Sequence, residues 1–398
     1  MSDSIFITGL GIVTGLGIGI NNNLKALLEE KTSIDEIKIL KSKHKELPVS
    51  EVKFTNEQMY EILKLSSEKI YTRTALLGGI ALKEAINSAE ITKNTEAKIA
   101  LISGTTVGGM DRSEEFYKDF FNNNTKNQYI QVHDCGTTTE LIANIFDGNF
   151  DFSTTISTAC SSALNSIILA ANLIKTERAD IVIAGGSESL SKFHFNGFNT
   201  LMILDKQKCR PFDKTRAGLN LGEGAAFIVL ESEKSVKKRN IKTLCRLLGY
   251  ANTCDAYHQT ATSPEGIGAT MAMKKAIEKS NLLPENIDYI NAHGTGTDNN
   301  DITEGIAVMN IFGENIPNIS SLKSYLGHTT SAAGSVEAVL SIIAMCNNFI
   351  PANLNFNNKI DELNFSPNNK TIKNKEIKYL ITNSFGFGGN DTSCVFAK

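Results

Sequence analysis

Residues 157–174 read STACSSALNSIILAANLI, and a second stretch, GHTTSAAGSVEAVLSIIAMC at residues 327–346, repeats the same pattern. In both stretches apolar side chains recur at steps of three and four residues, which predicts a helix with one buried face. The buried face of the first helix would hold Cys160, Leu164, Ile167, Ala171 and Ile174. That of the second would hold His328, Ala332, Val336, Val339 and Ile343. Each face therefore begins with a reactive side chain, a thiol in one helix and an imidazole in the other.

Apolar, strand-like segments recur in one order around these two helices. Short apolar runs that alternate with helices indicate an α/β protein whose central strands are buried. The corresponding pairs of segments are residues 5–15 with 245–254, 99–109 with 287–297, and 179–189 with 378–389. A repeated order of elements indicates a duplication. We expect two similar α/β halves, residues 1–235 and 236–398, divided near the charged stretch ESEKSVKKRN at residues 231–240.

The composition is typical of a globular protein from a reducing compartment. The chain has 398 residues, 41% of them hydrophobic, and a net charge of −3, so it lacks the basic excess expected for binding nucleic acid. Its most membrane-like segment, residues 5–20, contains five glycines and is too short to span a bilayer. The seven cysteines show no spacing typical of zinc ligands. We therefore expect a cytoplasmic protein with no metal, no membrane segment and no nucleic-acid partner.

Cys160 has the position of a nucleophile. Unpaired N–H groups and the dipole at a helix N-terminus favour a thiolate, which is the reactive form of cysteine. A buried structural cysteine is the alternative reading of the same position. In a duplicated fold, however, the equivalent helix starts can approach each other and bring Cys160 close to His328. A thiol beside an imidazole is the minimum arrangement for covalent acyl transfer.

Two glycine-rich stretches in the second half add candidates. His293 lies in NAHGTGTD, where glycines let the backbone pass close to a ligand. NSFGFGGND at residues 383–391 surrounds Phe385 and Phe387 with glycines. It is either a tight turn with core-filling rings, or a loop that offers an N–H to an oxyanion while a ring gates the cavity. The remaining histidines, which lack such surroundings and are interpreted as structural or surface groups, are His44, His133, His194 and His258.

Four motifs together resemble the β-ketoacyl-acyl-carrier-protein synthases of the type II elongating class. They are TACSSALNSI around Cys160, NAHGTGTDNND around His293, SSLKSYLGHTTSAAG around Lys323 and His328, and NSFGFGGND. The resemblance continues from ITGLGIVT near the start, through RPFDKTRAGLNLGEGAA, to the end of the chain. It implies a thiolase-like fold, in which two pseudo-duplicated α/β halves form α-β-α-β-α layers and usually dimerise.

The resemblance also implies a reaction and its residues. Cys160 would take an acyl group from the phosphopantetheine thioester of an acyl carrier protein. His293 and His328 would promote the decarboxylation of malonyl-carrier protein and stabilise the enolate for a Claisen condensation. Lys323, with Glu337, would hold the charge network of the site. No cofactor is implied, because the phosphopantetheine arrives on the carrier protein.

Further positions follow from the same resemblance. The backbone N–H groups of Cys160 and Phe385 would form the oxyanion hole, with Phe385 also acting as the gate. The substrate-binding positions implied are Thr295, Thr297, Phe198 and Phe387. Because the carrier protein is acidic, basic side chains should lie near the cavity mouth. The candidates are Lys64, Lys69 and Arg73 in a predicted helix, and Lys206 and Lys208 before RPFD.

Several departures leave the substrate open. The family pattern differs at Asn300, Ser331 and Asn390-Asp391, and the Asn-rich segment 110–137, which approaches the dimer interface and acyl tunnel in the family, is short. Acyl-chain length is therefore not predicted, nor whether the dimer is a homodimer or a heterodimer. The alternatives are a specialised synthase of a polyene pigment or polyketide pathway and a non-catalytic chain-length partner. A degradative thiolase is disfavoured, because Cys394 lacks the glycine-flanked loop expected there.

Overall fold

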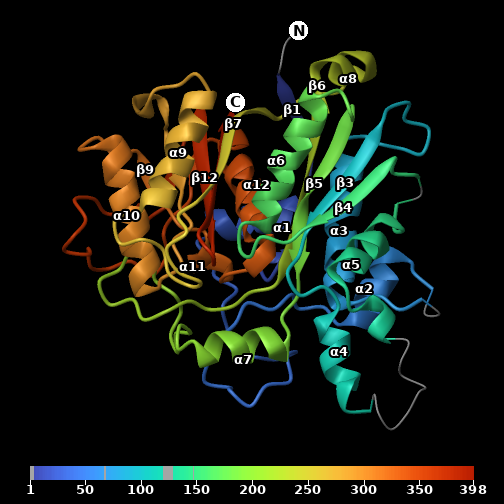
Figure 1. The fold of residues 1–398 in the computed structure, drawn as a ribbon, viewed down its shortest axis with the longest axis horizontal. Coiled ribbons are helices and arrows are strands. Elements are labelled where there is room, and N and C mark those ends of the chain that lie inside the picture. The colour runs from blue at the N-terminus through green and yellow to red at the C-terminus, as the bar shows by residue number, and fades with distance from the viewer. Residues whose placement is uncertain (1–3, 67–68, 120–128, 147) are drawn as a thin grey trace.

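The computed structural model of the protein describes residues 4–66, 69–119, 129–146 and 148–398 (Figure 1). The Asn-rich run at residues 120–128, whose composition predicts a solvated insertion, lies outside the described residues. Within the described ranges, eleven strands form one mixed sheet and helices pack on it. None of the helices in these ranges combines the length and the apolar character needed to cross a membrane.

The strand order of the sheet is the same in both halves of the chain. Counted outward from the middle, the first half has β1 (Ile5–Thr14), β6 (Gly224–Ser232), β5 (Ile181–Glu188), β3 (Ile99–Gly104) and β4 (Phe152–Ile156). The second half has β7 (Cys245–Cys254), β13 (Asn390–Ala397), β12 (Tyr379–Gly386), β8 (Tyr289–Asn291) and β9 (Asn318–Ser320). In each half the two outer pairings are parallel and the two inner ones antiparallel. β1 pairs with β7 at the junction. The predicted duplication is confirmed.

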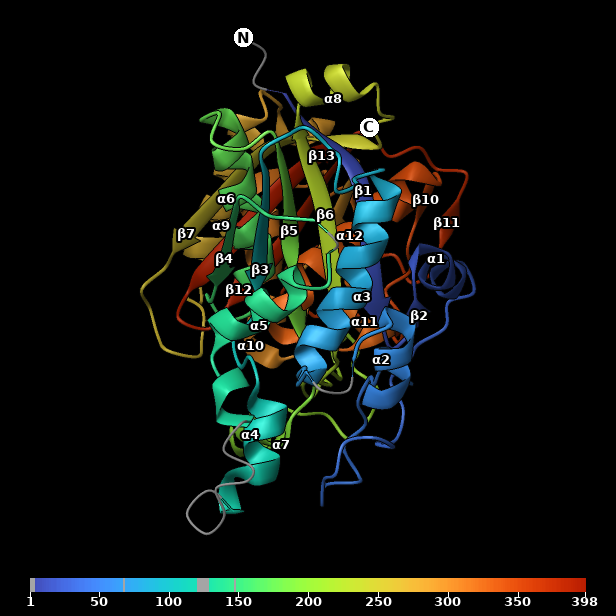
Figure 2. The ribbon, with the colours of Figure 1, turned by 90° about the vertical axis from the view of Figure 1, so that its right-hand side faces the viewer.

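The helices form three layers around the two halves of the sheet. α3 (Arg73–Ser88) packs on the outer face of the first half, and α9 (Ile267–Lys279) on the outer face of the second. α6 (Ser162–Lys175) and α12 (Ala333–Cys346) pack against each other and against strands of both halves. Figure 1 shows these two helices in the middle, with α9 on the left, and Figure 2 shows α3 on the opposite side. The order of layers is α-β-α-β-α, as predicted.

The two central helices are buried because a half-sheet covers each side of them. Every residue predicted on the buried face of the first helix is buried, and so is every residue predicted for the second. α12 is buried on all sides from Ala333 to Met345. Its Gly334 lies against α6, where an added Cβ would be 2.7 Å from the Cβ of Leu164 and 2.9 Å from its backbone N. The absence of a side chain at Gly334 therefore sets how closely the central helices approach.

Replacing Gly334 by alanine is expected to lower the free energy of unfolding by about 1–3 kcal/mol, because the new methyl group overpacks the contact between the central helices. Urea denaturation followed by circular dichroism measures this change. Gly136→Ala is the matched control, since an added Cβ at this exposed position in helix α5 (Cys135–Ala143) has nothing within 4 Å. Alanine also has the higher helix propensity, so the control should be neutral or stabilising. Equal loss in both variants would contradict the packing argument.

The remaining elements surround this framework. The helices are α1 (Ile20–Leu28), α2 (Asn56–Leu63), α4 (Met110–Phe116), α7 (Lys192–Thr200), α8 (Glu233–Arg239), α10 (Asp298–Phe312) and α11 (Lys323–Leu326). Three short strands, β2 (Gly17–Ile18), β10 (Phe349–Ile350) and β11 (Ile372–Lys373), complete the described elements. The Asn- and Lys-rich composition of residues 355–376 predicts a solvated insertion, and this prediction is wrong in part. Ile360, Leu363 and Phe365 are buried in one core cluster with residues of α9 and α10. The division of the chain at residues 235 and 236 stays a prediction.

The parallel strands bring the predicted site residues to one edge of the sheet. The carboxyl ends of parallel strands meet at the same edge, where α/β proteins bind their ligands. Cys160 follows β4, His293 follows β8, and His328 follows β9 through α11. Phe387 lies in the turn directly after β12. Residues from both halves therefore meet where the two half-sheets face each other.

Candidate active site

A sharp turn between β4 and α6 presents Cys160. Ala159, just before it, has a φ of 52°, which is rare for a residue with a side chain. The hydroxyl of Ser162 holds this turn by accepting a hydrogen bond from the N–H of Thr158 and donating one to the carbonyl of Ala159. From β12, the hydroxyl of Ser384 donates to the carbonyl of Cys160 at 2.9 Å. The strained turn is thus fixed by bonds from both halves of the protein.

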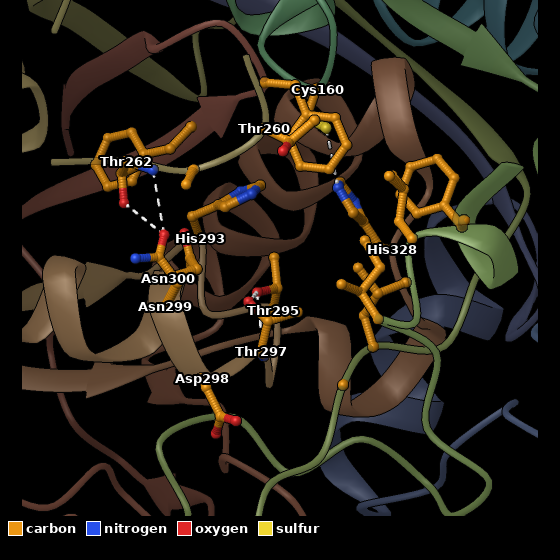
Figure 3. Close-up of a pocket in the computed structure, with 18 of the residues that line it drawn as sticks. Cys160, Thr260, Thr262, His293, Thr295, Thr297, Asp298, Asn299, Asn300 and His328 are labelled. Atoms are coloured by element: carbon orange, nitrogen blue, oxygen red, sulfur yellow. Dashed lines mark hydrogen bonds between the residues drawn. The ribbon is translucent and has the colours of Figure 1, made fainter. Parts of the chain in front are cut away.

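The structure brings Cys160 and His328 together. The Sγ of Cys160 lies 3.1 Å from the Nε2 of His328, and both side chains are buried (Figure 3). The backbone of His328 is held by the neighbouring segment 220–222, since its N–H donates to the carbonyl of Asn220 and its carbonyl accepts from Gly222. A thiol and an imidazole from equivalent places in the two halves therefore face each other.

Burial decides the charge of this pair. It raises the pKa of the Cys160 thiol to about 11, and the smaller opposing effects of Lys323 and of the N–H of Phe387 do not offset it. Burial also holds the pKa of His328 well below its usual value, and Lys323 adds to this effect. The expectation that the helix N-terminus makes Cys160 a thiolate is wrong, because desolvation of the sulfur outweighs it. At neutral pH the pair is a neutral thiol beside a neutral imidazole.

The alkylation rate of Cys160 by iodoacetamide is therefore expected to rise about tenfold per pH unit from pH 7 to 9.5, because only the thiolate reacts. Below a raised pKa the thiolate fraction increases steadily with pH, whereas an ordinary cysteine with a pKa of about 8.5 would level off. Mass spectrometry of the peptide that contains Cys160 gives the rate at this site. The exposed Cys254 in the same digest is the internal control. A plateau below pH 8 at Cys160 would contradict the assignment.

A fully buried ion pair holds the second imidazole. The Nζ of Lys323 lies 2.6 Å from the Oε1 of Glu337, 2.6 Å from the carbonyl oxygen of His293 and 3.2 Å from the Nδ1 of His293. Because the ammonium group has only donors, the Nδ1 of His293 accepts, and its ring proton lies on Nε2. Burial, followed by Lys323 and His328, holds the pKa of His293 well below its usual value. His293 is thus a neutral ring with a defined N–H donor.

Sequence reasoning missed Glu304, which fixes the backbone of this histidine. Its two carboxylate oxygens accept hydrogen bonds from the N–H groups of His293 and Gly294 at 2.8 and 2.7 Å. Asn383, on β12, donates to the same carboxylate. Burial raises the pKa of Glu304 to about 7. A carboxylate on the buried face of α10, among apolar neighbours, was the signal for it in the sequence.

These side chains line a cavity of about 330 Å³ that opens at the surface. Cys160, His293 and His328 lie in its wall, and the rings of the two histidines approach edge to face with centroids 5.3 Å apart (Figure 3). The predicted substrate-binding residues Thr295, Thr297, Phe198 and Phe387 all line the same cavity. The hydroxyls of the two threonines are hydrogen-bonded to each other. The cavity is therefore a route from the surface to the thiol.

The structure does not support Phe385 as the gate. Phe385 lies within β12, and although it lines the cavity, its ring is buried against His293 and the core. Phe387 lies in the following turn, is half-buried, and stacks on Phe198 at a centroid distance of 5.9 Å. Its backbone N–H also faces the Cys160 sulfur. Both the gate and the second oxyanion donor are therefore better placed at Phe387.

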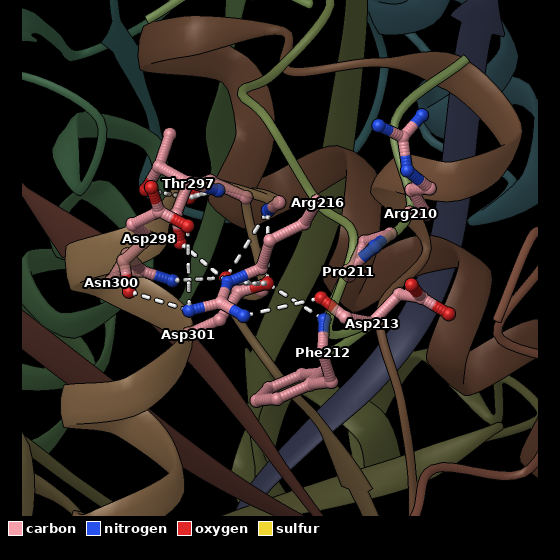
Figure 4. Close-up of polar contacts among 12 residues, drawn as sticks. Arg210, Pro211, Phe212, Asp213, Arg216, Thr297, Asp298, Asn300 and Asp301 are labelled. Carbon is pink, nitrogen blue, oxygen red and sulfur yellow. Dashed lines mark hydrogen bonds and ion pairs between the residues drawn. The ribbon is translucent and has the colours of Figure 1, made fainter. Parts of the chain in front are cut away.

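A buried network holds the mouth of the cavity on the side of α10 (Figure 4). The carboxylate of Asp301 accepts hydrogen bonds from the N–H groups of Phe212 and Gly296 and from the side chain of Asn300. Arg216 donates to the carbonyl of Thr297 at 3.2 Å. The departure from the family pattern at Asn300 therefore lies within a network that supports the loop with His293, Thr295 and Thr297.

The first half contributes a polar cluster that sequence reasoning also missed. Glu188 accepts hydrogen bonds from Thr105, Thr106 and Ser331, which is one of the departures from the family pattern. His194, interpreted above as a surface or structural group, is buried. Burial lowers the pKa of His194 below its usual value, and the opposing effect of Glu188 is smaller. A charge on His194 would also lower the pKa of His328. Ser331, three residues after His328, is therefore part of a buried polar cluster.

One of the predicted docking residues is buried. Arg73 begins α3 and binds Glu223 through two hydrogen bonds of 2.8 and 2.6 Å. Desolvation of both groups is offset by this bidentate contact, so Arg73 supports the fold and does not contact a partner. Lys64, which ends α2, and Lys69 are exposed, as are Lys206 and Lys208. The single helix predicted for residues 64–73 is wrong, since the helices there are α2 and α3.

Comparison with known proteins agrees with this geometry. The family model described as "Beta-ketoacyl synthase, N-terminal domain" matches residues 2–235, and "Beta-ketoacyl synthase, C-terminal domain" matches residues 244–357. The 3-oxoacyl-[acyl-carrier-protein] synthase 2 of Coxiella burnetii is 30% identical over 410 residues, covering 99% of this chain and 98% of that protein. The synthase of the same name from Synechocystis sp. is 31% identical over 411 residues, with coverage of 99% and 98%.

Solved structures show the same fold. The ishigamide ketosynthase/chain length factor superposes with a TM-score of 0.91 at 25% identity, over 99% of each chain. A ketosynthase in complex with its chain length factor from Xenorhabdus doucetiae gives a TM-score of 0.85 at 28% identity, over 99% of this chain and 98% of that one. The family models, the full-length relatives and the shared fold show that this chain belongs to the β-ketoacyl synthases, a family of type II condensing acyltransferases with the thiolase fold.

Proposed function

We propose that the protein is a 3-oxoacyl-[acyl-carrier-protein] synthase that loads an acyl chain on Cys160 and condenses it with malonyl-carrier protein. The contact of 3.1 Å between the Cys160 sulfur and the His328 Nε2 carries this proposal. It supplies a nucleophile with a proton acceptor at the end of a cavity that is open to a substrate. The full-length relatives named as 3-oxoacyl-[acyl-carrier-protein] synthase 2 support the reaction class.

In the first stage the acyl group moves from the carrier protein to the enzyme. The Cys160 sulfur attacks the thioester carbonyl while its proton passes to the Nε2 of His328. The tetrahedral oxyanion that forms beside the sulfur receives hydrogen bonds from the backbone N–H groups of Cys160 and Phe387, both of which face the sulfur. The pantetheine sulfur then leaves and takes the proton from His328. The product is an acyl thioester on Cys160.

In the second stage malonyl-carrier protein occupies the same cavity. Its carboxylate leaves as CO2, and the electron pair forms a thioester enolate. The Nε2–H of His293 donates to the enolate oxygen, and a neutral His328 supplies a second N–H when its proton is on Nε2. The enolate carbon attacks the acyl thioester on Cys160. The Cys160 sulfur leaves as a thiolate and takes up a proton from solvent, and the β-keto thioester departs on the carrier protein.

Lys323 supports both stages without contacting the substrate. Its ammonium group, paired with Glu337, donates a hydrogen bond to the Nδ1 of His293. Its positive charge also lowers the pKa of both histidines. Both rings are therefore neutral before each stage, so that His328 can accept the proton of Cys160 and His293 can donate its Nε2–H to the enolate. No metal or bound cofactor takes part in the proposed reaction.

We propose an acyl carrier protein, loaded with acyl or malonyl groups, as the partner, together with a second subunit. β4 is one of the two edge strands of the sheet, and Phe152 on it is 48% exposed. An exposed edge is a template for pairing with another chain. That subunit is either a second copy or a related chain, since two structural neighbours are a ketosynthase/chain length factor and a ketosynthase in complex with its chain length factor.

A specialised polyketide or polyene synthase is the second candidate. The TM-score of 0.91 with the ishigamide ketosynthase/chain length factor favours it. The geometry of the thiol and both histidines disfavours the third reading, a non-catalytic chain-length partner.

The test is a condensation assay with acyl-carrier protein and malonyl-carrier protein, read by mass spectrometry of the pantetheine arm. The proposal predicts a β-keto thioester extended by the two carbons that malonate contributes, and release of CO2. A panel of saturated and polyunsaturated acyl chains distinguishes fatty-acid elongation from the specialised pathway. Absence of the β-keto product with every chain, both alone and with a related subunit added, would refute the proposed reaction.

A further inference from the structure

We propose that the acidic carrier protein docks in a basic groove between the loop of residues 38–46 and helix α7. This inference rests on the proposed function, since it names the docking surface for the protein substrate of that reaction. The groove has a volume of about 680 Å³, and its lining includes Lys41, Lys43, His44 and Lys192. In Figure 1 the blue loop passes below α7 at the bottom of the molecule.

The loop that forms one wall of the groove is firmly anchored. The carboxylate of Glu51 accepts hydrogen bonds from the backbone N–H groups of residues 38–40 at distances of 2.6 to 3.0 Å. Leu40 and Leu47, at the two ends of the exposed tip, are buried in a core cluster with Phe195 of α7. The ring of His44 also packs against Phe195. The backbone of the tip is therefore already ordered at the groove, so docking does not have to order it.

The groove carries unpaired positive charge. The tip reads KILKSKHKE, residues 38–46, and holds four lysines. Lys38 pairs with Asp35, and His44 lies 3.6 Å from Glu46. Among the described residues, no ion pair includes Lys41, Lys43, Lys45 or Lys192. The whole chain has a net charge of −3, so this excess of positive charge is local to the groove. It favours an acidic partner and steers its approach.

The carboxylates nearest to the groove already have partners. Glu51 binds the loop backbone, as described above. Glu114 accepts hydrogen bonds from the N–H groups of Lys192 and Phe193 at the start of α7. Glu115, the next residue on α4, pairs with Arg112. These acids are directed to protein groups, so they leave the lysines of the groove available to an external anion.

Helix α7 separates the groove from the mouth of the active-site cavity. Asn199 and Thr200 line the groove, whereas Phe198, Leu201 and Met202 line the cavity. Met202 is 88% exposed and Leu201 is 44% exposed. A carrier protein in the groove would therefore contact an apolar rim and would pass its pantetheine arm over the end of α7 toward Cys160. Acidic side chains beside a small apolar patch are the surface chemistry that fits.

The test compares two triple charge reversals in the full-length protein, each combined with Cys160→Ala so that docking is measured without loading. Lys41→Glu, Lys43→Glu and Lys192→Glu reverse the three lysines that line the groove. Lys234→Glu, Lys274→Glu and Lys275→Glu reverse exposed lysines on α8 and α9 and change the net charge equally. Fluorescence anisotropy with labelled acyl-carrier protein gives the Kd. At low salt the groove variant should bind at least about tenfold more weakly, and the control should bind within about twofold of the parent.

A second measurement separates docking from chemistry. With Cys160 intact, the groove variant should still be acylated at the parental rate by an acyl N-acetylcysteamine thioester, which has no carrier protein. Equal weakening in both triple variants, or parental carrier binding by the groove variant, would overturn the docking proposal. Absence of acylation of the parent protein by either thioester would instead overturn the proposed function, while the anisotropy result would still decide the docking surface.

Discussion

Replacing Cys160 by alanine is expected to lower the rate of condensation by at least about 10³-fold, because no acyl-enzyme can form without the sulfur. The loss should affect kcat and not only KM, since the cavity that receives the pantetheine arm does not change. Steady-state assays with acyl- and malonyl-carrier protein measure both constants. Malonyl decarboxylation, which the proposed mechanism assigns to His293 and His328, should persist in this variant.

Cys209→Ala is the matched control for this substitution. Cys209 is also buried, with its Sγ 3.2 Å from the carbonyl oxygen of Lys323, but it faces no imidazole. Burial raises its pKa to about 12. Cys209 is therefore a buried structural cysteine, which was the alternative reading of Cys160. The control should keep its condensation activity within a few-fold. Equal activity of both variants would contradict the assignment of the nucleophile.

Replacing Lys323 by methionine is expected to destabilise the protein by about 3–5 kcal/mol, because the carboxylate of Glu337 is left buried without its cation. Burial already raises the pKa of Glu337 even with Lys323 beside it. Urea denaturation gives the change in the free energy of unfolding. Activity should also fall by at least about tenfold, since the Nδ1 of His293 loses the donor that fixes its ring proton.

The double variant Lys323→Met with Glu337→Leu separates the two effects. It removes both members of the ion pair and fills their space with apolar groups, so most of the lost stability should return. Activity should not return, because His293 still lacks its donor. Recovery of both stability and activity would show that Lys323 only neutralises Glu337, contrary to the role proposed for it.

The duplication made much of the site predictable from the sequence. Two helices with the same pattern, one beginning with Cys160 and the other with His328, indicated that the thiol and the imidazole would meet. The folded chain places them 3.1 Å apart. The equivalent strands and the α-β-α-β-α layers followed from the same repetition. Patterns that occur twice in a chain constrain the fold more strongly than either copy alone.

The predictions that failed depended on contacts between distant segments. Phe385 and Phe387 lie two residues apart, so strand periodicity places them alike. Phe385 ends up in β12 and Phe387 in the turn that follows it. This turn depends on Gly388 and Gly389, whose positive φ angles close the hairpin to β13. Arg73 was predicted at the surface, but it is buried because it pairs with Glu223, which lies 150 residues away in the chain. Desolvation of Cys160 likewise results from packing that no local pattern encodes.

The central claim is that Cys160 carries the acyl group, and intact-protein mass spectrometry after incubation with acyl-carrier protein tests it most directly. The account predicts one added acyl mass on the wild-type chain, located by peptide mapping on Cys160, and none on the Cys160→Ala variant. An acyl mass that persists in the variant, or one located at another residue, would contradict the account.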